Sequence, residues 1–377
     1  MNDKKNKWVN LSYANIATTA EVAHKENLEW ANSLASCGAA EFDANSEKNA
    51  MMPLRKSTAN LLNCEIGDIC IGSSATELIC SIAWALAPKN GCNIVSTQAS
   101  FPSTVYPWTR VSMEFDSEIR LAPYDENNYT NPADILKLID KNTSILTLSH
   151  VEYSSGQRYD LNLFANAAHD VGALIVIDAT QSMGVFPIDV HASELDFIVA
   201  SGYKWLRGTF GAAVAYINPK LHSSLMPGLL GFRSHNDMWD MQAKRFELPL
   251  DASRFEFSTI NFGAALGLAK SIDQINQMGI KNVWQNSIKL TDIIINECIK
   301  SNLTIISPLN DVERSGIICI QIPDDFDSKE VVRNLQEDYG ILVTSRSGFI
   351  RISPHIDNTP DQIFYFINSL KKVLQLK

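Results

Sequence analysis

The sequence predicts an α/β protein with a large domain built on a mostly parallel sheet and a smaller α/β domain at the C-terminal end. Between about residues 90 and 217, short β-rich runs alternate with amphipathic segments, which is typical of a parallel sheet flanked by helices. After residue 260 a long helical stretch precedes short strands, which indicates a second unit. A chain of 377 residues is long enough for both units.

Each element can be placed by its residues. Strands of the large sheet are expected at Cys92–Thr97, Ile119–Pro123, Ser144–Ser149, Leu174–Asp178, Phe197–Ala200 and Ala212–Ile217. Apolar residues at helical spacing predict helices over Ala75–Leu86 and Leu161–Val171, and Gly172 is suited to end the second. The C-terminal unit is expected to contain a helical stretch Ala264–Lys300 broken at Gly279, strands Gly316–Ile322 and Ile341–Val343, and a helix Pro360–Leu374.

These elements suggest three parts of the chain. Residues 1–20 form an N-terminal arm that we expect to pack on the small domain. Residues 21–260 form the large domain, and residues 261–377 form the small one.

Composition narrows the class of partner. Lys and Arg number 32 against 42 Asp and Glu, a net charge of −10, and no long basic stripe is present, so nucleic acid is an unexpected partner. The first residues lack the apolar core of a signal peptide, and no apolar run could cross a bilayer, so we expect a cytoplasmic protein without a membrane partner. Seven cysteines without a CxxC pair suit reduced thiols, and no spacing indicates a metal site.

Three polar residues follow strands of the predicted sheet. The third expected strand runs into His150, the fourth ends with Asp178, and the fifth is followed closely by Lys204. Because ligands of open α/β sheets bind at the carboxyl ends of the strands, an imidazole, a carboxylate and an amine are expected to meet there.

Each residue also has an ordinary interpretation. An aspartate after a strand can cap a helix or a turn, and most lysines are solvated. Lys204, however, lies between two expected strands and beside Tyr203 and Trp205. Partial desolvation there would lower the amine pKa, as an imine-forming nucleophile requires.

A lysine and an acid together suggest pyridoxal 5′-phosphate, which needs an amine for its aldehyde and an acid to keep its ring nitrogen protonated. The phosphate also needs a site. The run Gly72–Thr76 enters an expected helix, with Ala75 and Thr76 in its first turn, and offers backbone N–H groups, hydroxyls and the positive end of the helix dipole. A capped buried helix would account for this run equally well on its own.

Two longer motifs resemble a known family. The runs Val176–Gly184 and Ser201–Leu206, followed by Gly211, resemble those of the class V aminotransferases, fold-type I pyridoxal-phosphate enzymes that include cysteine desulfurases, kynureninases and isopenicillin N epimerase-like proteins. The resemblance covers nearly the whole chain. Further matching runs are Ala75-Thr76-Glu77, Phe101-Pro102-Ser103, Ser149-His150-Val151, Arg254-Phe255-Glu256 with Thr259, and Arg351-Ile352-Ser353-Pro354-His355.

The resemblance implies a role for several residues of the cofactor site. Lys204 forms the internal aldimine with the cofactor, and Asp178 pairs with the ring nitrogen. Gln181 lies near the phenolic oxygen of the ring, and Phe101 stacks on the ring. The positions that match phosphate-holding residues are Thr76, Ser201 and Tyr203.

The resemblance also extends to the partner subunit and the substrate. Thr259 matches a residue that reaches the phosphate of the neighbouring subunit, which implies a homodimer with shared active sites. His150 stands where kynureninases commonly have histidine, so it is a candidate catalytic residue. Arg351 matches the arginine that binds the substrate α-carboxylate. Asn15, in the arm, is a further candidate for substrate binding. Taken singly, Phe101 could be core, His150 a buried imidazole and Arg351 a structural ion pair.

The expected activity acts on an L-amino acid. The substrate amine displaces Lys204, whose freed amine removes the α-proton. The kynureninase-like features favour a lyase that cleaves a C–S or C–C bond at the β-position. An aminotransferase using an α-keto acid is the first alternative, and an epimerase or a non-catalytic cofactor-binding module comes next. A nucleotide-binding protein is disfavoured because no GxGxxG follows an expected strand.

A classical cysteine desulfurase is not expected. Such enzymes carry a mobile nucleophilic cysteine shortly before the carboxylate-binding arginine, and the run Gly340–Arg351 contains no cysteine. Cys319 lies in an apolar run and is expected to be structural. Arg346 or Arg233 could bind a second acidic group of the substrate.

Overall fold

A seven-stranded sheet forms the centre of the large domain. The computed structural model describes residues 8–376. The sheet order is β2-β8-β7-β6-β5-β3-β4, and β8 is antiparallel to both of its neighbours while the other adjacent pairs are parallel. The strands are β2 (Ile69–Gly72), β3 (Asn93–Thr97), β4 (Glu118–Ala122), β5 (Thr143–Ser149), β6 (Leu174–Asp178), β7 (Phe197–Ser201) and β8 (Ala213–Ile217). The predicted mostly parallel sheet is confirmed. Its strand β2 was not predicted, because four residues of which the last is a glycine are too short a pattern.

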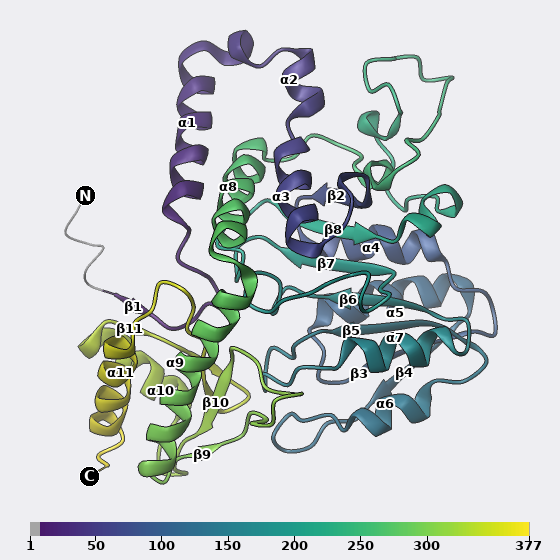
Figure 1. Cartoon of the computed structure of the whole chain (residues 1–377). Helices are drawn as coiled ribbons and strands as arrows, with labels where there is room; N and C mark the ends of the chain where they lie inside the picture. The colour runs from purple at the N-terminus through teal and green to yellow at the C-terminus, as the bar shows by residue number, and fades with distance from the viewer. Residues whose placement is uncertain (1–7, 377) are drawn as a thin grey trace.

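Helices cover both faces of this sheet (Figure 1). One buried cluster joins α4 and α5 to the sheet, and a second joins α3, α7 and α8 to the other face. The helices of this part are α1 (Glu21–Cys37), α2 (Ala44–Asn49), α3 (Met52–Leu62), α4 (Ala75–Leu86), α5 (Pro102–Phe115), α6 (Pro132–Leu138), α7 (Leu161–His169) and α8 (Phe262–Met278). Because both faces are buried, the central strands are apolar throughout rather than alternating.

The C-terminal unit contains a smaller, antiparallel sheet. Its order is β12-β13-β10-β9, and a separate parallel pair joins β1 of the arm to β11. The strands are β1 (Val9–Asn10), β9 (Thr304–Ile305), β10 (Ile318–Gln321), β11 (Ile341–Leu342), β12 (Thr344–Arg346) and β13 (Phe349–Ile352). The helices are α9 (Ile280–Lys300), α10 (Ser328–Tyr339) and α11 (Pro360–Val373). They enclose a core of their own.

The arm connects the two parts of the molecule. Leu11 is fully buried in the core of the small unit, and the bonding of β1 to β11 continues the contact. Further along, the Ala17 amide donates to the Tyr203 carbonyl oxygen and the Ala20 amide donates to that of Arg207. The arm therefore runs from the small sheet to the loop that carries Lys204. Residues 1–7 of the expected arm lie outside the described residues.

Gly279 separates two consecutive helices that contribute to different cores. Helix α8 packs on the large sheet, whereas the following helix α9 packs in the small core. Gly279 has a positive φ of 78° and separates the two helices, as the sequence predicted for the break in this stretch.

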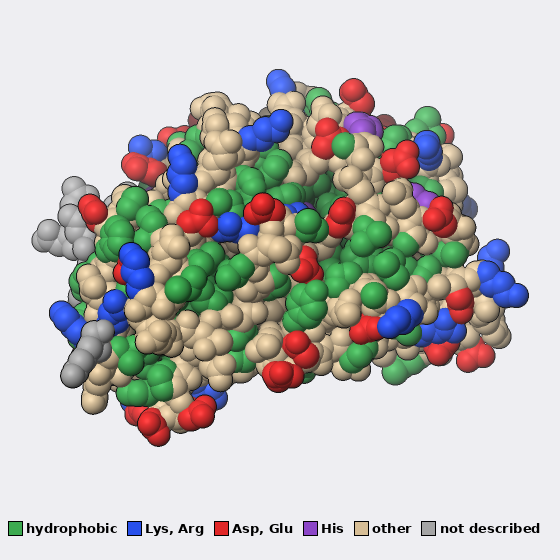
Figure 2. Space-filling view, turned by 60° about the horizontal axis from the view of Figure 1, so that its bottom comes forward, with side chains coloured by type: hydrophobic (Ala, Val, Ile, Leu, Met, Phe, Trp, Pro, Cys, Tyr) green, Lys and Arg blue, Asp and Glu red, His purple; other side chains and the backbone are tan. Residues whose placement is uncertain are grey.

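Charged side chains are spread over the surface shown in Figure 2, where lysines and arginines lie singly between acidic and apolar side chains. Within residues 8–376, no helix is both long and apolar enough to cross a membrane.

Gly184 allows the loop after β6 to approach the loop of Lys204. Its φ is +100°, and an added Cβ would lie 2.6 Å from the Trp205 carbonyl oxygen. Gly184→Ala should therefore lower the free energy of unfolding by more than about 2 kcal/mol, because backbone strain and a backbone clash add. Gly172→Ala is the matched control, since Gly172 has a φ of +78° but open space around it, and strain alone should cost about 1 kcal/mol there. Equal losses in urea unfolding would contradict the proposed close approach.

Candidate active site

The carboxyl ends of β5, β6 and β7 lie at one edge of the large sheet. Ser149 and Asp178 are direct neighbours in the register of β5 and β6, and Asp178 is paired with Val199 of β7. A cleft of about 430 Å³ opens at this edge. Its lining residues are Ala75, Thr76, Phe101, Ser103, Ser149, Val151, Tyr153, Asp178, Thr180, Gln181, Ser201, Tyr203 and Lys204. The structure thus brings together most of the residues that the sequence assigned to a cofactor site.

Asp178 is held as a hydrogen-bond acceptor at the floor of the cleft. One carboxylate oxygen accepts from the Thr180 amide at 2.9 Å, and the other accepts from the Thr104 hydroxyl at 3.1 Å. The side chain is buried. These donors fix the direction of the carboxylate, as the partner of a protonated ring nitrogen requires.

Lys204 places a buried amine in the same cleft. Its Nζ lies 5.6 Å from the centre of the Phe101 ring and 5.8 Å from that of Tyr203. Burial lowers the pKa of this amine to about 8, the carboxylate of Asp178 opposes the shift, and nearby arginines add to it. A substantial neutral fraction at mildly basic pH suits the amine to attack an aldehyde.

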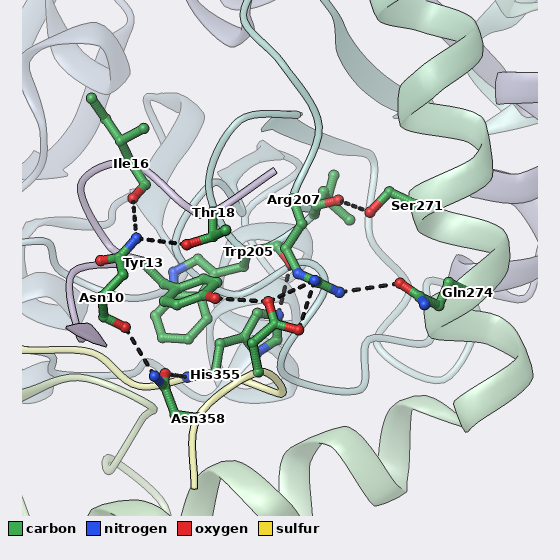
Figure 3. A network of polar contacts seen from close by, with 12 residues as sticks. Asn10, Tyr13, Ile16, Thr18, Trp205, Arg207, Ser271, Gln274, His355 and Asn358 are labelled. Atoms are coloured by element: carbon green, nitrogen blue, oxygen red, sulfur yellow. Dashed lines mark hydrogen bonds and ion pairs between the residues drawn. The ribbon is translucent and has the colours of Figure 1, made fainter. Parts of the chain in front are cut away.

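A polar network fixes the loop that carries Lys204 (Figure 3). The Trp205 indole donates to Gln181 at 3.0 Å, and His355 donates to the Trp205 carbonyl oxygen at 2.9 Å. Arg207 donates to Asp357 at 2.8 Å, and Asp357 also accepts from the Tyr13 hydroxyl at 2.8 Å. Hydrogen bonds therefore join the loop to Gln181, to the arm and to the small unit. They fix the backbone from which the side chain of Lys204 extends.

The N-terminus of α4 forms another wall of the cleft. Ser74 caps this helix by accepting from the Glu77 amide, and the Ala75 amide donates to the Ser201 hydroxyl at 3.3 Å. Thr76 is exposed in the first turn and donates to the Ser103 hydroxyl at 2.9 Å. Hydroxyls and the positive end of the helix dipole therefore meet at one place, where an anion is favoured.

Aromatic side chains border the opening. Phe101 is exposed, caps the start of α5 and packs edge to face on Tyr153 with 5.4 Å between ring centres. Gln181 donates to the Ala14 carbonyl oxygen at 3.0 Å while it accepts from Trp205. Phe101 and Gln181 therefore both line the cleft, from different elements of the large domain.

His150 does not share the cleft with Lys204 and Asp178. Its imidazole is buried, its Nδ1 lies 2.9 Å from the Ser182 hydroxyl, and its ring packs edge to face on Phe186. Burial lowers the pKa of the imidazole to about 3. Side chains along an extended segment alternate, so Ser149 and Val151 line the cleft while His150 turns away. His150 therefore does not line the cleft, and its expected catalytic role stays a prediction.

Three other candidates lie outside the cleft lining. Thr259 is exposed and lines no part of the cleft of its own chain. Arg351, on β13, is fully buried and donates to the Tyr153 carbonyl oxygen at 2.6 Å. Asn15 is half-buried in the arm and accepts from Arg346 at 3.1 Å. Arg351 is therefore linked to the cleft through Tyr153. Asn15 is linked to it through the preceding residue Ala14, whose carbonyl oxygen accepts from Gln181.

Glu152 was not identified from the sequence. It is fully buried, and one oxygen accepts from the hydroxyls of Thr97 at 3.1 Å and Ser100 at 3.0 Å. Its other oxygen has no hydrogen bond, although the phenol of Tyr159 lies beside the same carboxyl group. Burial raises the pKa of Glu152 to about 7. Glu152 holds the loop that leads to Phe101, and a charged residue after an apolar strand was the signal that could have revealed it.

Similarity to known proteins agrees with this geometry. The sequence profile of the family Aminotransferase class-V matches residues 10–363. The chain belongs to this family. A probable cysteine desulfurase of Methanothermobacter thermautotrophicus is 26% identical over 360 residues, covering 88% of each chain. A kynureninase of Geobacillus thermodenitrificans is 25% identical over 329 residues, covering 82% of this chain and 74% of the other.

Solved structures share the fold. The cystine C-S lyase C-DES, in complex with its reaction product cysteine persulfide, matches with a TM-score of 0.88 at 18% identity, covering 97% of this chain and 98% of the other. A variant of C-DES carries glycine covalently linked to its PLP cofactor, with a TM-score of 0.88 at 17% identity and coverage of 99% and 98%. The predicted family and the fold-type I architecture are confirmed. The cleft fits pyridoxal 5′-phosphate, because it combines a buried amine, a fixed carboxylate and an anion-binding helix start.

The titration of Glu152 should make the free energy of unfolding of the protein depend on pH. Because the folded protein keeps this proton up to about pH 7 while the unfolded chain releases it near 4.5, the group destabilises the fold progressively between these pH values. Glu152→Gln removes that loss, so its stability relative to the native chain should rise by up to about 3 kcal/mol from pH 4.5 to 7.5. Chemical denaturation at several pH values measures it. The exposed Glu126→Gln control should show no such slope, and a flat difference for Glu152→Gln would contradict a neutral Glu152.

The pKa of Lys204 should be visible when the apoprotein captures pyridoxal 5′-phosphate. Covalent capture requires the neutral amine, so the rate should rise with pH and level off through a midpoint near 8 rather than 10.5. Stopped-flow absorbance measures this rate. Borohydride reduction should then label Lys204, Lys204→Ala should lose the label, and the exposed control Lys220→Ala should keep it. A label on another lysine would remove Lys204 from this role.

Proposed function

We propose that the chain is a pyridoxal-phosphate lyase that cleaves a C–S or C–C bond at the β-position of an L-amino acid. The cofactor, when bound, withdraws electrons from the substrate α-carbon. The observation that carries the proposal is the buried amine of Lys204, which faces Asp178 across a cleft that contains no thiol among its lining residues. The kynureninase and cystine lyase similarities also concern enzymes that break bonds at this position.

The residues of the cleft have separate proposed roles in holding the cofactor and moving the α-proton. Asp178 would hold the proton on the ring nitrogen, and the start of α4 with Thr76, Ser201 and Tyr203 would hold the phosphate. Phe101 would cover the ring. Lys204 would bind the cofactor through Nζ and would accept the substrate α-proton at the same atom. The lowered pKa of its amine favours the proton-accepting form.

Arg351 is proposed to bind the substrate α-carboxylate. Its buried guanidinium donates to one backbone carbonyl oxygen, its Nε has no partner, and no carboxylate of the described residues lies within ion-pair distance. A buried guanidinium without an anion is costly, and a bound carboxylate would compensate it. The interpretation of Arg351 as a structural ion pair therefore has no support.

A persulfide-forming desulfurase is disfavoured even though relatives of that name match the chain. Cys319 lies on β10 directly opposite Arg351, fully buried, and its thiol donates to the Ser154 carbonyl oxygen at 3.1 Å. Burial raises the pKa of this thiol to about 11. A thiolate that transfers sulfur must be exposed and mobile, and Cys319 is neither.

The assembly is proposed to be a homodimer with shared sites. Thr259 is exposed and lines no part of its own cleft, as a residue that serves the partner's phosphate would be. Large apolar side chains are also exposed in the segment before it, at Leu230, Met241, Phe246 and Leu250. We propose that each subunit consists of an N-terminal arm, a large cofactor-binding domain and a small domain, and that these three parts meet at the cleft.

The activity can be tested with the purified holoenzyme and a panel of S-substituted L-cysteines, with and without an α-keto acid. A lyase acting on a C–S bond adds water overall and yields the thiol, pyruvate and ammonia in equal amounts without a keto acid. Coupled pyruvate and thiol assays measure them, and Lys204→Ala should abolish product formation. A pyridoxamine spectrum that a keto acid reverses, without pyruvate, would establish an aminotransferase instead.

A further inference from the structure

Two arginines of the small unit lie on one face of its sheet. In the antiparallel register of β12 and β13, Thr344 is opposite Arg351 and Arg346 is opposite Phe349. Residues two apart on a strand, and the residues opposite them, project to the same side. The side chains of Arg346 and Arg351 therefore leave the sheet together as diagonal neighbours.

Arg346 has no acidic partner. It is half-buried, and its guanidinium donates to the Ser345 carbonyl oxygen at 3.0 Å and to Asn15 at 3.1 Å. In the part of the chain that the structure describes, no carboxylate lies within ion-pair distance of it. Both bonds are to neutral oxygens, so they orient the guanidinium and leave its charge uncompensated.

The contacts of Asn15 place Arg346 beside the cleft. Asn15 follows Ala14, whose carbonyl oxygen accepts from Gln181 of the cleft lining. The positive charge of Arg346 is close enough to lower the pKa of Lys204 and of Arg351. Arg346 and Arg351 thus lie beside the residues that line the cleft, and the proposed α-carboxylate accounts for one of these two guanidinium groups.

We propose that Arg346, oriented by Asn15, binds a second carboxylate on the β-substituent of the substrate. The substrate class is then an L-amino acid whose leaving group ends in a carboxylate. This inference rests on the proposed function, in which Arg351 takes the α-carboxylate.

The spacing of the two arginines fits such a substrate. The backbone positions of diagonal neighbours on antiparallel strands lie about 7–8 Å apart, so two long side chains that start there can each reach a different carboxylate of one small substrate. Arg233, the other arginine considered for this task, is buried, donates to the Glu47 carbonyl oxygen and lies 3.8 Å from the Glu47 carboxylate, so its charge already has an acidic partner. The small-unit sheet therefore carries the candidate for substrate selection.

The test uses two substrates that differ in charge alone. S-carboxymethyl-L-cysteine carries the second carboxylate, and S-carbamoylmethyl-L-cysteine replaces it with an amide of nearly the same shape. The native holoenzyme should prefer the acid by at least about tenfold in kcat/KM. In Arg346→Gln the value for the acid should fall by at least about tenfold and that for the amide by less than about threefold. The loss should lie mainly in KM, because a binding contact is removed.

Two further variants serve as controls. Arg346→Lys keeps the charge without the planar fork and should retain part of the preference. Arg333→Gln removes one positive charge from an exposed arginine of α10 that pairs with Glu330, and it should leave both substrates unaffected. Asn15→Ala should weaken the preference for the acid less than Arg346→Gln does.

The outcomes separate this inference from the proposed function. If both substrates yield pyruvate equally well, or if Arg346→Gln lowers both values alike, Arg346 does not select a second carboxylate, although the lyase activity stands. If neither substrate yields pyruvate while other S-substituted L-cysteines do, the selection of an acidic leaving group is wrong. If no member of the panel reacts, the proposed function itself fails.

Discussion

The burial of an amine and a carboxylate at the same sheet edge is the constraint on which the site depends. Removing Lys204 and Asp178 from water is unfavourable unless each is oriented and compensated. Thr104 and Thr180 donate hydrogen bonds to Asp178, while the rings of Phe101 and Tyr203 lie beside the amine of Lys204. The carboxylate consequently keeps its acceptor role, and the amine loses part of its basicity. This asymmetry suits the chemistry of a cofactor that needs one acid and one nucleophile.

The second half of the site depends on the small unit and the arm. Tyr13, Arg207 and Asp357 join the lysine loop to both, and Arg351 reaches the Tyr153 carbonyl oxygen across the same junction. Binding of a substrate carboxylate to the small unit would therefore affect the position of the loop that carries Lys204. The positions of the two arginines relative to the amine depend on this junction, which makes the arm part of the site as well as of the fold.

The similarity to desulfurases, kynureninases and a cystine lyase follows from shared cofactor chemistry. These enzymes need the same acid, amine and phosphate site, and they differ in the groups placed around the substrate side chain. In this chain the thiol nearest Arg351 is Cys319, which is buried within the small sheet, and the guanidinium of Arg346 lies near the cleft instead.

The sequence by itself determined the parallel strands of the large sheet, the helices α4, α7, α8, α9 and α11, the family, and the placement of Asp178 and Lys204 after adjacent strands, because these depend on local patterns and on motifs next to strand ends. Only the tertiary structure decided which neighbouring side chain faces the cleft. One step along an extended segment separates Ser149, in the cleft, from His150, buried beside Ser182. Glu152, Arg346 and Asn15 likewise acquire their surroundings from segments distant in the sequence. Such contacts depend on how the units pack, and no local pattern of residues encodes that packing.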